Sequence, residues 1–146
     1  MKPLKVGMKQ QRIANMKNDE LDIYIEYDFP NWNKYIEMER RNKYAANSQK
    51  QKEKKVVIYS TIGKKYKGEF PIEMYFKVHF KDHRRDLDNT RIKGLIDGLV
   101  TSSVIPNDNL NYIQRIVIEP VFDNQVGIEV KIRPLEKKKK ENDNLY

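Results

Sequence analysis

The stretch PIEMYFKVHF, residues 71–80, alternates apolar and polar side chains along its whole length. A period of two is typical of a β-strand that buries one face, here the face of Ile72, Met74, Phe76, Val78 and Phe80. Directly behind it come RRDLDN, residues 84–89, and then a helical pattern with apolar residues at i, i+3, i+4, i+7 and i+8: Ile92, Leu95, Ile96, Leu99 and Val100. Asp88 or Asn89 is suited to cap that helix. A strand, an acidic turn and a helix in direct succession therefore form the centre of the predicted fold.

Other elements follow from the same kind of pattern. LDIYIEYDF, residues 21–29, alternates and ends at Pro30, so it predicts a second strand. Residues 34–55 lack Gly and Pro and favour one long helix. VVIYSTI, residues 56–62, is rich in β-branched residues but continues that run, and we interpret it as helix. VIPNDNLN predicts a turn. RIVIEPV and VGIEVKI predict two strands joined as a hairpin through Asp123 and Asn124.

The order of these elements predicts an α+β fold, a small mixed β-sheet with helices packed on one face. A chain of 146 residues suits one domain. We expect a basic N-terminal extension at 1–20, a folded domain at 21–134 and a mobile basic and polar tail at 135–146.

Charge and composition limit the classes of function that this chain can have. The net charge of +8 favours a polyanionic partner, although a basic protein can also carry such charge for solubility alone. The absence of cysteine excludes zinc-finger sites and cysteine nucleophiles. No apolar run is long enough for a signal peptide or a membrane span, so we expect a cytoplasmic protein with no membrane partner.

Asp86 and Asp88 stand two residues apart. On an extended backbone both side chains would leave the same face, with Cα atoms about 6.6 Å apart. Two carboxylates about 4 Å apart repel by about 4 kcal/mol at an effective dielectric of 20, so a cation between them is favoured, and Mg²⁺ suits such oxygen ligands. Asp108 supplies a third carboxylate if residues 101–107 double back. Lys93 either serves a phosphate or forms an i, i+4 salt bridge with Asp97.

DLDN after a long alternating strand, the spacing K-x-x-x-D-G-L and the later IPNDN together resemble the RusA family of Holliday-junction resolvases, which is common in phages and prophages. The likeness covers residues 21–133 and includes FPNWNKYI. It implies a two-fold homodimer that uses Mg²⁺, with Mn²⁺ as a substitute, to cut opposed phosphodiesters of a four-way junction. It makes Asp86, Asp88 and Asp108 the metal ligands and Lys93 the essential lysine. The family lysine usually lies four residues after the second Asp, whereas Lys93 lies five after Asp88.

The sequence therefore predicts a magnesium-dependent endonuclease for DNA recombination and repair, in a bacterial or phage-infected host cytoplasm. Two alternatives remain open: a nuclease of the same fold acting on flaps and other branched DNA, and a non-catalytic nucleic-acid-binding protein. Residues 1–17 carry five cations and no acid, and residues 34–55 carry eight cations against three acids. We expect DNA contacts from these segments and from the acidic turn, with the candidates Asn33, Arg40, Arg41, Lys43, Arg84, Arg85 and Arg91.

Histidines and aromatic residues have simpler interpretations. His79 alternates to the outer face of its strand, and His83 lies beside the acidic turn, where we expect it to face solvent. Tyr35 and Tyr44 are expected in the core. Trp32 suits either a core position or stacking on exposed bases.

Overall fold

The computed structural model describes residues 19–136. Most of the predicted basic extension at 1–20 and of the predicted tail at 135–146 lies outside the described residues. Within residues 19–136, no helix has the length and apolar character that crossing a membrane requires.

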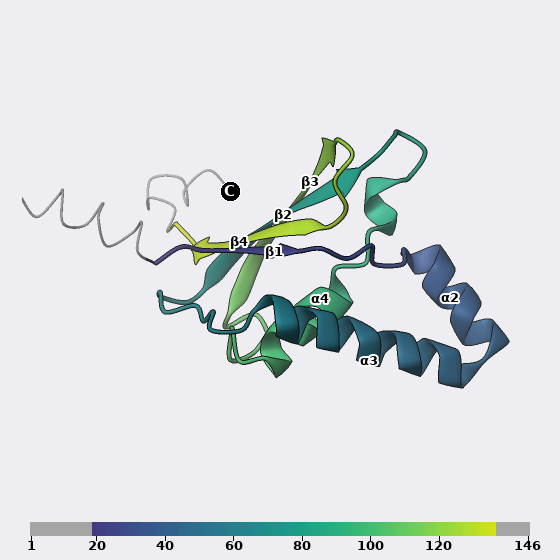
Figure 1. Ribbon diagram of the computed structural model, residues 1–146. Coiled ribbons are helices and arrows are strands. Elements are labelled where there is room, and N and C mark those ends of the chain that lie inside the picture. The colour runs from purple at the N-terminus through teal and green to yellow at the C-terminus, as the bar shows by residue number, and fades with distance from the viewer. Residues whose placement is uncertain (1–18, 137–146) are drawn as a thin grey trace, which may run out of the picture.

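The fold centres on one sheet of four strands in the order β1-β4-β2-β3. The strands are β1 (Leu21–Ile25), β2 (Ile72–Phe80), β3 (Ile113–Phe122) and β4 (Ile128–Pro134). β4 runs antiparallel to both β1 and β2, whereas β3 runs parallel to β2. The helices α2 (Trp32–Arg41), α3 (Lys43–Ser60) and α4 (Lys93–Thr101) lie on one side of the sheet, and the short 3₁₀ helix η1 (Leu87–Asn89) follows β2 (Figure 1). The predicted α+β class, a mixed sheet with helices on one face, is confirmed.

The core forms where β2 meets α4. The predicted inward face of β2 is confirmed, because Ile72, Met74 and Phe76 are fully buried. Leu95 and Leu99 of α4 are equally buried against them. The alternation of β2 and the 3.6-residue period of α4 therefore describe the two sides of one interface.

The predicted hairpin between the last two strands is wrong. β2 lies between β3 and β4, so the turn at residues 123–127 connects strands that are not neighbours. α4 carries the chain back along the sheet, which allows β3 to pair parallel with β2 at the sheet edge. Asp123 still forms a turn, since its side chain accepts a hydrogen bond from the Gln125 N–H over 3.0 Å.

The predicted single helix at 34–55 is two helices that meet at Asn42. Asn42 has an extended backbone, ends α2, and caps α3 with a side chain that accepts from the Tyr44 N–H over 2.9 Å. The helical interpretation of VVIYSTI is confirmed as far as Ser60. Tyr35 is buried as expected, but Tyr44 is 82% exposed because it opens α3 on the outer side, so its predicted core position is wrong.

Two glycines let α4 approach α3 closely. A Cβ added at Gly98 would lie 2.7 Å from Val57 Cβ, and one added at Gly94 would lie 2.7 Å from Glu53 Oε1. A side chain at Gly98 would push the two helices apart, and one at Gly94 would press on the buried Glu53 carboxylate.

Gly98→Leu is therefore expected to lower the free energy of unfolding by about 1–3 kcal/mol through overpacking against Val57. Urea denaturation followed by circular dichroism measures the change. Thr101→Leu, on the exposed end of the same helix, serves as the control and should stay within about 0.5 kcal/mol of the wild type. Equal stabilities of the two variants would contradict the close packing of α3 and α4.

Candidate active site

Asp86 and Asp88 lie in the segment that leaves the end of β2. Asp86 is extended and its carbonyl accepts a hydrogen bond from the Asn89 N–H over 3.2 Å, whereas Asp88 lies inside η1. The predicted arrangement on one face of an extended strand is therefore wrong, and the two carboxylates instead belong to one tight turn. Both are exposed. Neither Asp88 nor Asn89 caps α4, because that helix begins at Lys93, four residues beyond the 3₁₀ turn.

A small hollow beside this turn brings in a carboxylate that the sequence analysis did not single out. Asp28 and Asp86 both line it, together with Arg85 and the end of β2. The Arg85 guanidinium binds both oxygens of Asp28, at 2.9 and 3.2 Å. Hydrogen bonding to Asp28 raises the pKa of Arg85 above its ordinary value. Arg85, a predicted DNA contact, is thus held against the loop that contains Asp28. In the sequence, the only signal for Asp28 was its position at the end of the first predicted strand.

Asp108 lies at the other end of the sheet. The Ile72 N–H at the start of β2 donates to the Tyr112 carbonyl over 2.7 Å, and the Ile113 N–H donates to the Asn109 carbonyl over 3.0 Å. The Asp108 loop therefore adjoins the first residues of β2 and β3, while Asp86 adjoins Val78 and Phe80 at the end of β2. A strand of nine residues is about 30 Å long. Residues 101–107 do not double back as expected, because α4 has carried the chain along the length of the sheet (Figure 1).

Metal binding by one copy of the chain is limited by this separation. Among residues 19–136, no group of three or more His, Cys, Asp or Glu side chains is arranged to hold a metal ion. The two carboxylates of the η1 turn suit Mg²⁺, which commonly takes one or two protein carboxylates and fills its other positions with water and phosphate. The set of three predicted ligands does not fit a single site within one chain.

Lys93 is the first residue of α4 and its side chain is exposed. Within residues 19–136, no ion pair joins it to Asp97, so the alternative of an i, i+4 salt bridge is not seen. Lys93 follows η1 by four residues, and its ammonium group is free to approach a phosphate near that turn.

Arg91 is not a surface residue, and its predicted contact with DNA is wrong. It is 3% exposed and forms a bidentate salt bridge with Glu53 of α3, which is 0% exposed. The guanidinium also donates to the Pro30 carbonyl over 3.1 Å and lies 4.1 Å from the centre of the Tyr35 ring. Trp32 packs at the edge of Tyr35, which places it in this cluster. Arg91 therefore joins α2, α3 and the start of α4.

The other predicted DNA contacts are on the surface. Arg84 is 90% exposed and lies 3.6 Å from Asp82. Arg41 pairs with Glu37 along the outer side of α2. The remaining exposed candidates are Asn33, Arg40 and Lys43. These side chains can reach a phosphate backbone without any rearrangement of the core.

The two histidines have different surroundings. His79 lies on the outer face of β2 as predicted, and its side chain is covered there to 5% exposure, with Nδ1 2.9 Å from Asp123 and Nε2 3.4 Å from Glu129. His83 is exposed and stacks on Phe122 with ring centres 4.0 Å apart. Among residues 19–136, neither ring forms a hydrogen bond or an ion pair with Asp86 or Asp88.

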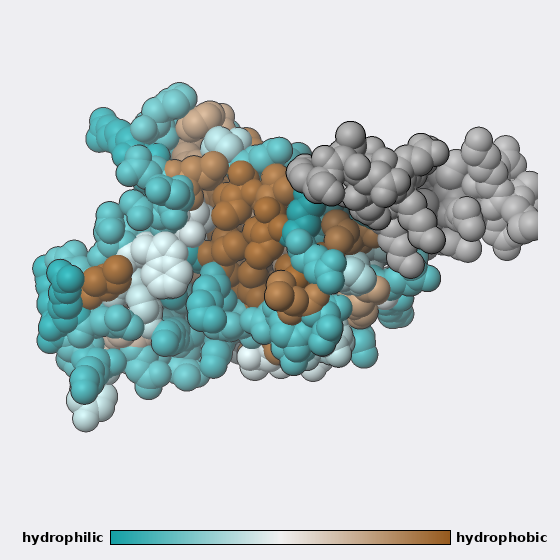
Figure 2. All heavy atoms as spheres, turned by 180° about the vertical axis from the view of Figure 1, so that it is seen from behind, coloured by the Kyte–Doolittle hydropathy of each residue, from teal (hydrophilic) through white to brown (hydrophobic). Residues whose placement is uncertain are grey.

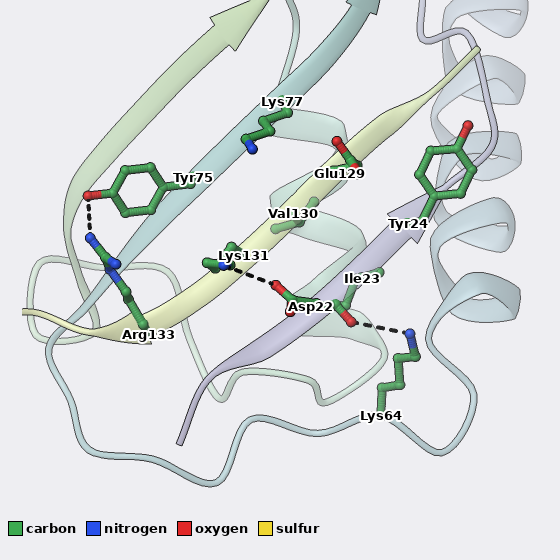
Figure 3. A pocket seen from close by; sticks show the side chains of 10 residues that line it. All are labelled: Asp22, Ile23, Tyr24, Lys64, Tyr75, Lys77, Glu129, Val130, Lys131 and Arg133. Carbon is green, nitrogen blue, oxygen red and sulfur yellow. Dashed lines mark hydrogen bonds and ion pairs between the residues drawn. The ribbon is translucent and has the colours of Figure 1, made fainter. Parts of the chain in front are cut away.

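The open face of the sheet carries a hollow of about 590 Å³ that the sequence analysis missed. Its lining includes four cations, Lys64, Lys77, Lys131 and Arg133, with two tyrosines among them, Tyr24 and Tyr75 (Figure 3). Arg133 donates to the Tyr75 hydroxyl over 2.7 Å, and Lys131 lies 3.9 Å from Asp22. The alternating pattern of β2 and β4 could have indicated this hollow, because it places Lys77 and Lys131 on the outward face of the sheet.

The family model described as "Endodeoxyribonuclease RusA" matches residues 3–133. No curated protein matches the chain.

Proposed function

Because the chain belongs to the RusA family of endodeoxyribonucleases, we propose that it is a magnesium-dependent endonuclease that resolves four-way DNA junctions by paired phosphodiester hydrolysis. The family match over residues 3–133 is the observation that carries this proposal. The exposed acidic turn after β2 supports it, because a nuclease needs carboxylates where a phosphate can approach them.

The proposed metal ligands are Asp86 and Asp88 in the η1 turn. Asp108 lies at the far end of the sheet in the same chain, so it would be the third ligand only from the other copy of a dimer. A divalent ion held there supplies activation of the attacking water and neutralises charge on the phosphate. Mn²⁺ has similar ligand preferences and is expected to substitute. The oxygen donors of the turn select for such hard cations.

Lys93 and Arg84 are the proposed phosphate ligands beside the metal site. Both side chains are exposed and flank the η1 turn in sequence. An ammonium or guanidinium group at this position stabilises negative charge that develops on the phosphate oxygens and on the leaving 3′ oxygen. Ile92, which caps α4, offers no side-chain acceptor, so the first N–H groups of that helix add positive potential nearby.

DNA backbone binding is proposed for the exposed cations of α2 and the start of α3, Arg40, Arg41 and Lys43, with Asn33. The cations of the open sheet face, Lys64, Lys77, Lys131 and Arg133, lie on the side of the sheet away from the helices and form a second positive surface. Such contacts give affinity with little sequence preference. A homodimer with two-fold symmetry is proposed because it presents two active sites to a junction that has the same symmetry.

A panel of end-labelled DNA substrates tests the proposed specificity. We expect the wild-type protein in Mg²⁺ to cut a four-way junction faster than a flap, and a flap faster than linear duplex. Equal rates on junction and flap would favour the second candidate, a nuclease of the same fold for branched DNA in general. This candidate is kept because the exposed cations among residues 19–136 suit the phosphates of any branched DNA and do not select a four-way junction.

A further inference from the structure

We infer that Asp28 sets the affinity of this chain for DNA by competing with a DNA phosphate for the guanidinium group of Arg85. In the free protein the Asp28 carboxylate holds this group, and a phosphate takes its place when DNA binds. The inference rests on the proposed function and adds a residue that the expected DNA contacts do not include. Asp28 acts through Arg85 and is a positioning residue, because it decides where the guanidinium group lies.

Asp28 binds Arg85 in the way that a phosphate would. Arg85 Nη1 lies 2.9 Å from Asp28 Oδ1, and Arg85 Nη2 lies 3.2 Å from Asp28 Oδ2, so two N–H groups bind two oxygens of one anion. Guanidinium groups bind phosphates through the same two-pronged contact. A phosphate that uses these N–H groups must therefore displace the Asp28 carboxylate.

The ion pair is accessible to such an exchange. The Arg85 side chain is 45% exposed and the Asp28 side chain is 56% exposed. Exposed ion pairs contribute little to stability, because water and salt screen them, so a phosphate can replace the carboxylate at small cost. The bidentate pair of Arg91 and Glu53 is different, because its side chains are 3% and 0% exposed and lie out of reach of a ligand.

Arg85 also lies where a phosphate must come to reach the acidic turn. It directly precedes Asp86, and Asp28, Arg85 and Asp86 line one hollow at the end of β2. The loop that follows β2 and carries Arg85 projects from the molecule as a hydrophilic tip, at the upper left of Figure 2. A ligand as large as DNA can therefore approach the guanidinium group directly from solvent.

The exchange changes what holds this loop. Among residues 19–136, the pair of Arg85 and Asp28 is the only ion pair or side-chain hydrogen bond that joins residues 81–86 to another part of the chain. The Asp82 side chain, by comparison, accepts from the Arg84 N–H within the loop itself. In the free protein, Asp28 therefore ties the loop to the segment after β1, and in the complex the phosphate replaces that tie.

Glu26 offers a matched control for Asp28. It is an exposed carboxylate two residues earlier in the same segment, whereas Asp28 is the carboxylate that Arg85 binds. Glu26→Gln and Asp28→Asn each replace a carboxylate by a neutral amide of the same size. Only the second substitution releases Arg85, so the difference between them isolates the competition from the general loss of a negative charge.

Gel-shift titration of a synthetic four-way junction in EDTA measures the affinity without cleavage. Asp28→Asn is expected to tighten binding by about two- to five-fold more than Glu26→Gln does, which is the fold-change that an exposed ion pair corresponds to. In an Arg85→Met background, the two substitutions should change the affinity equally. All three side chains are exposed, so the variants should fold, and circular dichroism checks this.

Three results would overturn the inference. Equal effects of Asp28→Asn and Glu26→Gln with Arg85 present would mean that only the negative charge matters. An excess for Asp28→Asn that persists in the Arg85→Met background would mean that Asp28 repels DNA directly. Weaker binding by Asp28→Asn would mean that Asp28 supports the loop in its DNA-binding shape, which is a structural role that cannot tighten binding when it is lost.

The proposed function and this inference fail by different results. If the wild type binds the junction but does not cut it in Mg²⁺, the proposed function fails, and the comparison of Asp28→Asn with Glu26→Gln still decides the exchange. If the wild type does not bind the junction, both fail.

Discussion

Asp88→Asn is expected to reduce the rate of junction cleavage in Mg²⁺ by at least about 100-fold, because it replaces a proposed metal ligand by a neutral amide. The change keeps the size of the side chain, and Asp88 is exposed in η1, so the fold should stay intact. Binding to the junction should survive or become tighter, because a negative charge that repels phosphate is removed. Single-turnover cleavage and gel-shift titration of the same junction measure both quantities.

Glu69→Gln is the control for this variant. Glu69 is exposed in the loop before β2, so its substitution removes the same charge far from the η1 turn. We expect its cleavage rate to match that of the wild type. Unchanged cleavage by Asp88→Asn would end the hypothesis of a catalytic acidic turn and leave the alternative of a non-catalytic nucleic-acid-binding protein.

Arg91→Met is expected to lower the free energy of unfolding by about 3–5 kcal/mol, because it leaves the carboxylate of Glu53 buried without its partner. The hydrogen bond to Pro30 and the stacking on Tyr35 are lost as well. Chemical denaturation followed by tryptophan fluorescence measures the effect, since Trp32 lies in the same cluster. The double variant Arg91→Met with Glu53→Leu should recover most of the loss, because removing both members of a buried ion pair is often neutral.

If Arg91→Met lowered the free energy of unfolding by less than about 1 kcal/mol, the buried ion pair would be contradicted, and the prediction of a surface position for Arg91 would stand. Arg84→Met shows the difference between a buried, paired arginine and an exposed one. Arg84 is exposed, so this variant should keep its stability and weaken DNA binding instead.

Local patterns in the sequence were sufficient for the elements around the acidic turn. The alternation of Ile72, Met74 and Phe76 identified the central strand, and the spacing of Leu95 and Leu99 identified the helix that covers it. These patterns record burial on one face, which is a local consequence of the fold. They carry no information on which strand lies beside which, so the sheet order was not predictable from them.

Three of the errors, those at Arg91, Asp123 and Asp108, share a cause in contacts between distant residues. Arg91 looked like a phosphate ligand because its partner Glu53 lies in α3, 38 positions earlier. The hairpin was predicted at Asp123 because nothing in the sequence of the turn shows that β2 lies between β3 and β4. Asp108 looked close to Asp86 because the direction of the intervening helix relative to the sheet is a tertiary property. The family resemblance identified these carboxylates as a set, and the structure adds that one copy of the chain does not assemble them.

Cleavage of a synthetic four-way junction with and without magnesium tests the central claim most directly. The wild-type protein, first in excess EDTA and then after addition of Mg²⁺, is incubated with a junction labelled on each strand in turn. We predict no cutting in EDTA and, on addition of Mg²⁺, paired nicks at symmetrical positions on two opposed strands. Cutting that is equal in both conditions, or an intact junction after Mg²⁺ is added, would contradict the account.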